Sequence, residues 1–271
     1  MTQPAGTIRA GIGGWVFPEW REGMFYPDGL PQREELAYAS AQLGCIEINS
    51  TFYRAQTPAV YAQWAEQTPA GFRFSAKGPR TITQTHDLVA AAGRADGFIQ
   101  GIATLQDRLG PLVWQFGERH PAGADEFDRF LEGLPREADG ITLQHALEVR
   151  NPQAWTPSLV AVARARNAAL VFSGSTEYPS YADPTADFVY ARLMQSRGNL
   201  RAGYPTRTLE QWALRSLRWA RGDDNPDLPH IGATVQPTAP RDVYVLFIGA
   251  AKHRNPGAAM TLQQQLDTLG G

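Results

Sequence analysis

Eight short apolar runs, most of them separated by helical patterns, constrain the fold of this chain more than any other feature. The runs resemble strands bounded by turn residues. They cover Ile8–Gly13, Cys45–Asn49, Phe72–Lys77, Leu112–Phe116, Leu143–Arg150, Ala169–Ser173, Phe188–Met194 and Val243–Ile248. Strands that alternate with helices along a chain are typical of a parallel sheet, because each parallel crossover needs room for a helix.

Seven segments have helical patterns. They cover Arg33–Leu43, Ala59–Glu66, Leu88–Leu109, Ala124–Leu134, Ser158–Arg166, Leu209–Ala220 and Pro256–Leu269. Residues 174–187, between the sixth and seventh strands, include Pro179 and Pro184 and predict a loop. Eight such units in 271 residues fit a barrel better than an open sheet. We therefore predict an α/β fold, a TIM-like (β/α)8 barrel formed as one domain by residues 1–271, irregular in lacking one crossover helix between strands six and seven.

Composition limits the classes of partner. The formal net charge is −2, which gives no general basic field for nucleic acid, so a nucleic-acid partner is not favoured by charge. Cys45 is the only cysteine, so no internal disulfide forms. The chain begins without a signal-peptide pattern and has no apolar run long enough to cross a bilayer. These features predict a cytoplasmic protein without membrane association, whose oligomeric state the sequence does not indicate.

Cofactor motifs are weak. The glycines of Gly11-Ile12-Gly13-Gly14 are followed by Trp15-Val16-Phe17-Pro18 instead of a helix start, which argues against a dinucleotide site. The five histidines are scattered without the spacing of a metal site. We predict no cofactor and no metal-binding residue, and leave a divalent metal open.

The second strand carries polar groups on one face. Residues two apart in a strand point the same way, so Glu47 and Asn49 share a face opposite Ile46 and Ile48. The fifth strand repeats this arrangement, with Glu148 and Arg150 on the face opposite Leu147 and Val149. In (β/α)8 enzymes the reacting groups lie at the carboxyl ends of the strands. The ends of these strands therefore predict a site at the barrel rim.

Two carboxylates and three cations meet at this predicted rim. Glu47 and Glu148 are the candidate catalytic acid and base. The candidate substrate-binding residues are Trp15, Asn49, Tyr53, Lys77, Gln115, Arg150 and Arg192. The cations favour an anionic ligand. A purely structural network of buried ion pairs would give the same pattern, and this alternative stays open.

Several motifs resemble a known family. They are Gly13-Gly14-Trp15, Glu47-Ile48-Asn49-Ser50-Thr51-Phe52-Tyr53, Phe72-Arg73-Phe74-Ser75-Ala76-Lys77 and Glu148-Val149-Arg150. Together they resemble the domain of unknown function 72 family, also called YecE-like, over nearly the whole chain. The resemblance implies a (β/α)8-like barrel without an assigned activity, similar in shape to endonuclease-IV barrels. The chain also departs from the family pattern at three places. Gln84 stands where the family commonly has His, and Gly174 stands where it commonly has Asp. Phe247-Ile248-Gly249-Ala250 replaces a Phe-Asn-Asn-Asp-like strand end of the family.

Three functions follow as hypotheses. The first is an enzyme that acts on a small anionic, phosphate-bearing substrate by general acid–base chemistry, such as a hydrolase or lyase. The second, by analogy with the endonuclease-IV shape, is a metal-assisted phosphodiesterase or nuclease. The third is a barrel that binds a ligand or nucleic acid without turning it over.

Overall fold

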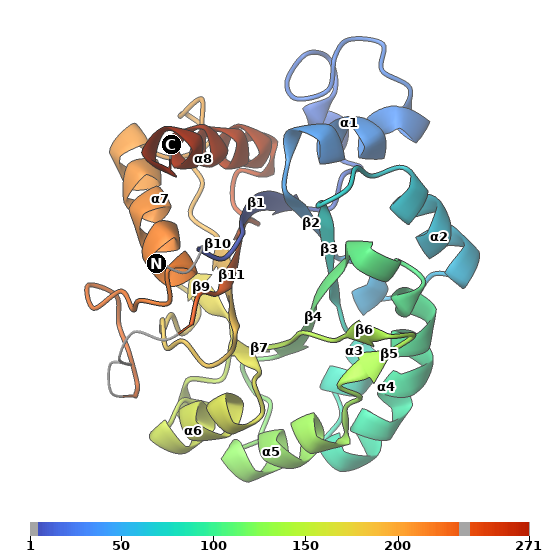
Figure 1. Cartoon of the computed structure of the whole chain (residues 1–271), viewed down its shortest axis with the longest axis vertical. Helices are drawn as coiled ribbons and strands as arrows, with labels where there is room; N and C mark the ends of the chain where they lie inside the picture. Colours follow the sequence, from blue (N-terminus) through green and yellow to red (C-terminus); the bar gives the residue numbers. More distant parts are fainter. Residues whose placement is uncertain (1–4, 233–238, 271) are drawn as a thin grey trace.

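The computed structural model describes residues 5–232 and 239–270. A ring of strands occupies its centre and helices surround the ring (Figure 1). The strands of this sheet are β1 (Ile8–Gly13), β2 (Cys45–Ile48), β3 (Arg73–Lys77), β4 (Leu109–Phe116), β7 (His145–Val149), β8 (Ala169–Leu170), β9 (Phe172–Gly174), β10 (Phe188–Leu193) and β11 (Asp242–Phe247). All their pairings are parallel. The predicted α/β TIM-like barrel is confirmed.

The sixth strand is split into two short pieces. β8 pairs with β7 and β9 pairs with β10, and only Val171 separates the pieces. The backbone N–H of Val171 donates to the carbonyl of Leu147 at 2.9 Å. The two pieces together thus take one position in the ring and complete it with eight strand positions.

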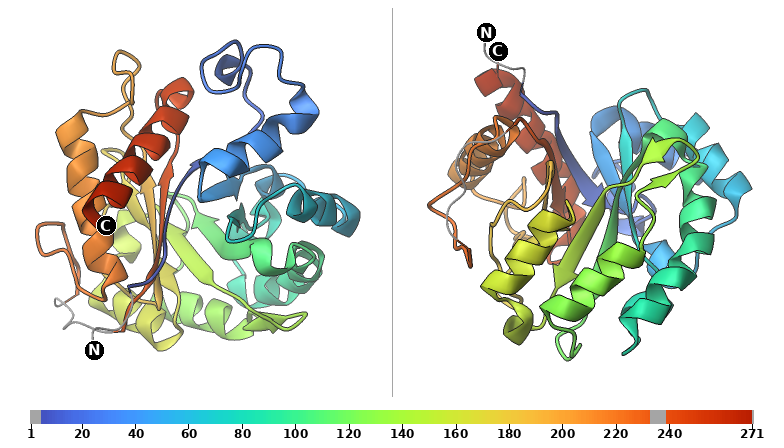
Figure 2. Two further views of the ribbon diagram at one scale, coloured as in Figure 1. Left: turned by 45° about the horizontal axis from the view of Figure 1, so that its top comes forward. Right: turned by 60° about the horizontal axis from the view of Figure 1, so that its bottom comes forward.

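The helices cover the outside of the ring (Figures 1 and 2). They are α1 (Glu35–Gln42), α2 (Pro58–Glu66), α3 (Arg80–Thr83), α4 (Leu88–Ala103), α5 (Ala124–Gly133), α6 (Pro157–Ala165), α7 (Thr206–Ala220) and α8 (Asn255–Gly270). Residues 175–187 contain no helix, as predicted. Within the described part of the chain, no helix has the length and apolarity to span a membrane.

Several boundaries differ from the prediction by a few residues, and α7, for example, begins at Thr206 instead of Leu209. The helix predicted over Leu88–Leu109 ends at Ala103, because the chain turns through a left-handed backbone at Gln106, with φ of 52°. β4 consequently begins at Leu109, three residues before its predicted start. A small hairpin of β5 (Glu137–Ala138) and β6 (Ile141–Thr142) precedes β7 and was not predicted.

The buried apolar residues form two separate clusters. The larger cluster packs the outer face of the strands against the helices and includes Ile46 and Trp114. The smaller cluster fills the barrel interior with Cys45, Val113 and Tyr190 among its members. This inner cluster forms an apolar floor, above which the polar ends of the strands project.

Candidate functional site

A cavity of about 720 Å³ opens at the carboxyl ends of the strands. This rim pocket has a volume within the usual range for small-molecule sites. Six of the predicted site residues line it, and they are Trp15, Asn49, Tyr53, Lys77, Gln115 and Arg150. The other three, Glu47, Glu148 and Arg192, are buried and do not line the pocket.

Aromatic side chains form one wall of the rim pocket. The rings of Trp15 and Trp64 meet edge to face, with centroids 4.8 Å apart. Phe52 and Tyr53 pack in the same manner at 5.3 Å, and Tyr53 is 72% exposed. Both pairs leave ring surface at the pocket, which suits a ligand with a flat or apolar body.

The segment after β1 is tied to the segment after β11. The indole N–H of Trp20 donates to the backbone carbonyl of Lys252 at 2.8 Å. The Lys252 ammonium lies 5.6 Å from the centre of the Phe17 ring. These contacts bring Lys252 to the pocket, and η6 (Lys252–Arg254) and α8 follow directly.

The charge of the pocket lining has one sign. Lys77, Arg150 and Lys252 line the pocket, and no Asp or Glu among the described residues does so. Neutral polar groups of Asn49, Ser50, Gln115 and Asn255 also line the pocket. The Asn49 amide approaches Gly13 so closely that a Cβ at that glycine would lie 2.8 Å from Asn49 Nδ2. The pocket therefore offers cations and amides to a ligand, without a competing carboxylate.

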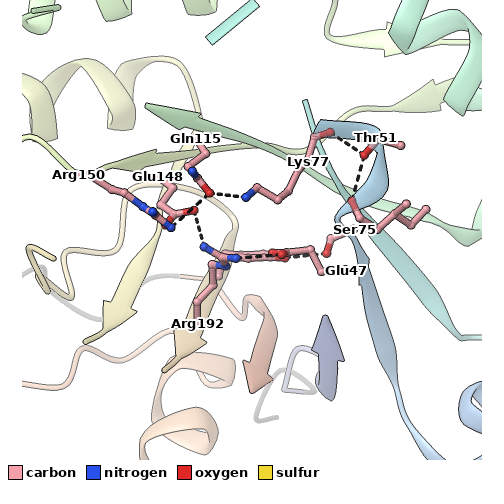
Figure 3. A network of polar contacts seen from close by, with 10 residues as sticks. Glu47, Thr51, Ser75, Lys77, Gln115, Glu148, Arg150 and Arg192 are labelled. Carbon is pink, nitrogen blue, oxygen red and sulfur yellow. Dashed lines mark hydrogen bonds and ion pairs between the residues drawn. The ribbon is translucent and has the colours of Figure 1, made fainter. Parts of the chain in front are cut away.

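A buried charge chain lies beneath this lining (Figure 3). Arg192 donates from Nη2 to Glu47 Oε1 at 3.0 Å and from Nη1 to Glu148 Oε2 at 2.5 Å. Arg150 donates from Nε to Glu148 Oε1 at 2.9 Å. We call Glu47, Arg192, Glu148 and Arg150 the charge chain. Its signs alternate, so each carboxylate contacts at least one guanidinium in an interior where unpaired charge is costly.

Hydroxyl groups complete the coordination of Glu47. The hydroxyl of Tyr190 donates to Glu47 Oε2 at 2.8 Å, and Ser75 Oγ lies 2.6 Å from the same hydroxyl. Burial raises the pKa of Tyr190 well above its ordinary value, and the charge of Glu47 adds to the effect. Tyr190 therefore stays protonated and acts as a fixed donor to Glu47.

The surrounding cations keep Glu148 ionised. Burial raises the pKa of its carboxyl, but Arg192, Arg150 and Lys77 together outweigh burial, so the pKa lies below its ordinary value. For Arg192 the two effects have the opposite signs. Burial lowers the pKa of its guanidinium, but the charges of Glu148 and Glu47 outweigh burial, so the pKa lies above its ordinary value. Glu148 and Arg192 thus stabilise each other's charged form.

Arg150 joins the charge chain to the pocket. Its guanidinium contacts Glu148 below and lies 4.0 Å from the centre of the Tyr178 ring. Tyr178 belongs to the loop that replaces the missing crossover helix, so that loop covers one side of the site. With its position set by two neighbours, Arg150 can present its remaining N–H groups to a ligand without losing much conformational entropy.

Gln115 links the two cations of the strand ends. Its Oε1 accepts a hydrogen bond from Lys77 Nζ and another from Arg150 Nη2, the latter at 3.3 Å. The Lys77 Nζ also lies 4.6 Å from the centre of the Phe52 ring. The backbone carbonyl of Lys77 accepts from Thr51 Oγ1 at 2.7 Å, which joins the turn after β2 to the end of β3.

The three positions that depart from the family pattern differ in whether they line the pocket. Gly249 lines the pocket and has a φ of 68°, in the left-handed region that favours glycine. Gln84 follows α3, Gly174 ends β9, and neither lines the pocket. Only one of the three departures therefore changes the surface that a ligand in the rim pocket would meet.

Lys252 is the pocket cation that the sequence prediction omitted. It follows an irregular turn after β11, where strand periodicity gives no direction for a side chain. A compositional signal was available, however. Lys77 and Lys252 are the only lysines of the whole chain, although it has 25 basic residues.

The carboxylates and histidines do not gather into a metal cluster. Across residues 5–232 and 239–270, no group of three or more His, Cys, Asp or Glu side chains could hold a metal ion.

Comparison with known proteins places the chain among barrels of one family. The family described as "Protein of unknown function DUF72" matches residues 9–270. The Escherichia coli K12 protein named "UPF0759 protein YecE" is 32% identical over 141 residues, which is half of this chain and 47% of that protein.

Solved structures show the same fold at lower sequence identity. A DUF72 family protein from Thermotoga maritima superposes with a TM-score of 0.72 at 19% identity, covering 96% of this chain and 99% of that one. A DUF72 family protein from Enterococcus faecalis gives 0.66 at 16% identity, covering 96% of both chains. None of these names states an activity.

Proposed function

Because the chain belongs to the DUF72 family, whose description states no activity, we propose a function from the rim pocket itself: an enzyme that acts on a small anionic substrate with a flat or apolar body. The observation that carries the proposal is the lining. Three cations and several aromatic rings face one cavity, which no described carboxylate lines. An anionic group on Arg150 and Lys252, with its body against Trp15 and Phe52, satisfies both parts of this surface.

A phosphate or carboxylate group suits the cations geometrically. Nε and Nη2 of Arg150 contact Glu148 and Gln115, so its Nη1 is the nitrogen that can donate to a phosphate or carboxylate. The charge chain supports this arrangement, because Glu148 neutralises part of the charge of Arg150 while fixing its direction. Lys77 adds a third positive group on the opposite side of Gln115.

The roles of Glu47 and Glu148 as acid and base remain part of the proposal. Both carboxylates accept hydrogen bonds from Arg192, and each has a further partner. A proton transfer to Glu148 from a ligand requires Arg150 to move aside, whereas the role of Glu148 in holding Arg150 requires no movement. Turnover by Glu148→Gln and Glu47→Gln separates these two roles.

Ligand binding can be followed by tryptophan fluorescence, since Trp15, Trp20 and Trp64 line the pocket. We expect phenyl phosphate to bind more tightly than phenol or inorganic phosphate, and its affinity to fall with added salt. Removing one charged partner in Lys252→Met is expected to weaken binding about 10-fold. Arg94→Met removes an exposed cation of α4 and is the matched control.

Two outcomes contradict this assignment. If phenol binds as tightly as phenyl phosphate, the pocket has no anion site. If Lys252→Met and Arg94→Met lose the same affinity for phenyl phosphate, the effect comes from the net charge of the protein and not from the pocket. Binding without turnover in a screen of phosphate esters and organic acids would favour the ligand-binding barrel over the enzyme.

A further inference from the structure

The two lysines of the chain occupy the same pocket. Of 25 basic residues only Lys77 and Lys252 are lysines, and both line the rim pocket, while the other 23 are arginines. Arginine supplies positive charge everywhere else in the molecule. What lysine adds is a primary amine that can lose its proton and attack an electrophile, which a guanidinium does not do.

Lys77 has the surroundings of a reactive amine. It is the last residue of β3 and only 8% exposed. Its ammonium forms no ion pair with a carboxylate in the described part of the chain, because Arg192 and Arg150 occupy the nearby Glu47 and Glu148. Lys252, by contrast, is exposed at the pocket edge.

The neighbouring groups favour the neutral amine. Burial, and next the charge of Arg192, lower the pKa of Lys77 to about 8, against smaller opposing effects of the two carboxylates. At pH 7.5 about a quarter of such amines are neutral, compared with roughly one in a thousand at the ordinary lysine pKa. A lysine buried beside other cations is a known way to obtain a nucleophilic amine.

We propose that Lys77 forms an imine with the carbonyl carbon of the anionic substrate, whose anionic group rests on Arg150 and Lys252. The inference rests on the proposed function and names its substrate class, an aldehyde or ketone that also carries a phosphate or carboxylate. Gln115 Oε1 accepts hydrogen bonds from both Lys77 and Arg150, so amine and guanidinium lie within about 7 Å of each other. That separation suits a small molecule with its two groups a few bonds apart.

The step balances without an oxidant or reductant. The neutral Lys77 nitrogen adds to the carbonyl carbon, the carbonyl π electrons move to oxygen, and that oxygen takes a proton as nitrogen loses one. The resulting hydroxyl is protonated again and leaves as water, while the nitrogen lone pair forms the carbon–nitrogen double bond. The protonated imine then withdraws electrons from the adjacent carbon, which weakens a C–H or C–C bond there.

Borohydride trapping tests this reaction on the full chain. The probe is pyridoxal 5′-phosphate, an aromatic aldehyde with a phosphate group. Sodium borohydride reduces an imine to a stable secondary amine, and peptide mass spectrometry locates it. We expect the adduct on Lys77, at least 10-fold more than on Lys252, with a labelling rate that has its midpoint near pH 8 and is suppressed by phenyl phosphate.

Two variants calibrate the labelling. Arg94→Lys adds an exposed amine on α4 as a reference for ordinary reactivity. Lys77→Arg retains the charge and removes the amine, so we expect it to lose the adduct. Circular dichroism of Lys77→Arg reports whether the barrel is intact.

The outcomes separate the two proposals. Phenyl phosphate binding without a Lys77 adduct overturns the imine and leaves the anion pocket standing. Adducts spread equally over Lys77, Lys252 and the amine introduced by Arg94→Lys also overturn it, because reactivity would then follow accessibility alone. Absence of both binding and adduct overturns the inference together with the proposed function.

Discussion

Replacement of Arg192 by methionine tests the charge chain most directly. The guanidinium contacts both carboxylates, at 3.0 Å to Glu47 and 2.5 Å to Glu148, and all three side chains are at most 3% exposed. Methionine retains much of the apolar volume and removes the charge. After the change, Glu47 keeps the neutral hydroxyl of Tyr190 as its side-chain partner among the described residues, whereas Glu148 keeps Arg150. Loss of Arg192 therefore destabilises the ionised form of Glu47 more than that of Glu148.

The expected loss of stability follows from this inventory. Removing one partner of a buried ion pair costs about 3–5 kcal/mol, because the other charge is left without compensation. Glu47 bears most of that cost, and Glu148 adds less since Arg150 remains. We expect Arg192→Met to lower the free energy of unfolding by about 4 kcal/mol at pH 7. An exposed ion pair would cost no more than about 1 kcal/mol.

The pH dependence gives an independent signature. In the native protein the pKa of Glu148 lies below its ordinary value of 4.5, so Glu148 contributes stability above pH 4.5 that is lost as pH falls through the folded-state pKa. Without Arg192 the effect of burial gains weight and the pKa of Glu148 moves upward. The gap in stability between native protein and Arg192→Met is therefore expected to widen as pH rises from below 4.5 towards 7.

Urea denaturation followed by circular dichroism at several pH values measures both effects. Arg192→Met combined with Glu148→Gln is the matched control, because it removes the part of the widening gap that comes from Glu148. A loss below about 1 kcal/mol at pH 7 would refute the reasoning, since it would equal that of an exposed pair. So would a gap that stays constant with pH in the single variant.

Three further changes probe single contacts. Tyr190→Phe deletes the hydroxyl that donates to Glu47, and we expect the free energy of unfolding in urea to fall by about 1–3 kcal/mol. The folded-state pKa of Lys77 is about 8, below its value in the unfolded chain, so its charge costs stability below pH 8. The midpoint temperature of thermal unfolding is accordingly expected to be higher for Lys77→Met than for the native protein at pH 7. This advantage is expected to fall as pH rises from about 8 towards the unfolded-state pKa of about 10.4. Gly13→Ala would place a Cβ 2.8 Å from the Asn49 amide, and we expect several-fold weaker phenyl phosphate binding with little change in unfolding, because a side-chain end can move.

Periodicity predicted the strands and most helices because buried faces repeat at two or about 3.6 residues. It failed where local backbone decided the outcome. Leu105 and Leu109 continue the apolar pattern of α4, yet the left-handed turn at Gln106 ends the helical path and starts β4. The split of the sixth strand around Val171 is equally invisible, because Val171 is as apolar as Leu170 and Phe172 on either side of it.

Strand spacing predicts a face for each side chain but not its depth. Glu47 lies within β2 and is fully buried, whereas Asn49, just beyond the end of β2, lines the pocket. Sequence spacing gives no measure of where the apolar floor ends. It also gave no reason to place Arg192 between two carboxylates, since those three residues come from strands far apart in the chain.

The charge chain and the pocket are parts of one electrostatic arrangement. Glu47 and Glu148 face three buried or partly buried cations, Lys77, Arg150 and Arg192, so the group holds more positive than negative charge. The excess is located at the pocket, because Arg192 is enclosed by carboxylates while Lys77 has none as a direct partner in the described part of the chain. An anion on Arg150 would balance the excess and stabilise the ammonium of Lys77, which opposes attack by its amine. A carbonyl ligand resolves this conflict, because the protonated imine restores the positive charge beside the anion once the new bond has formed.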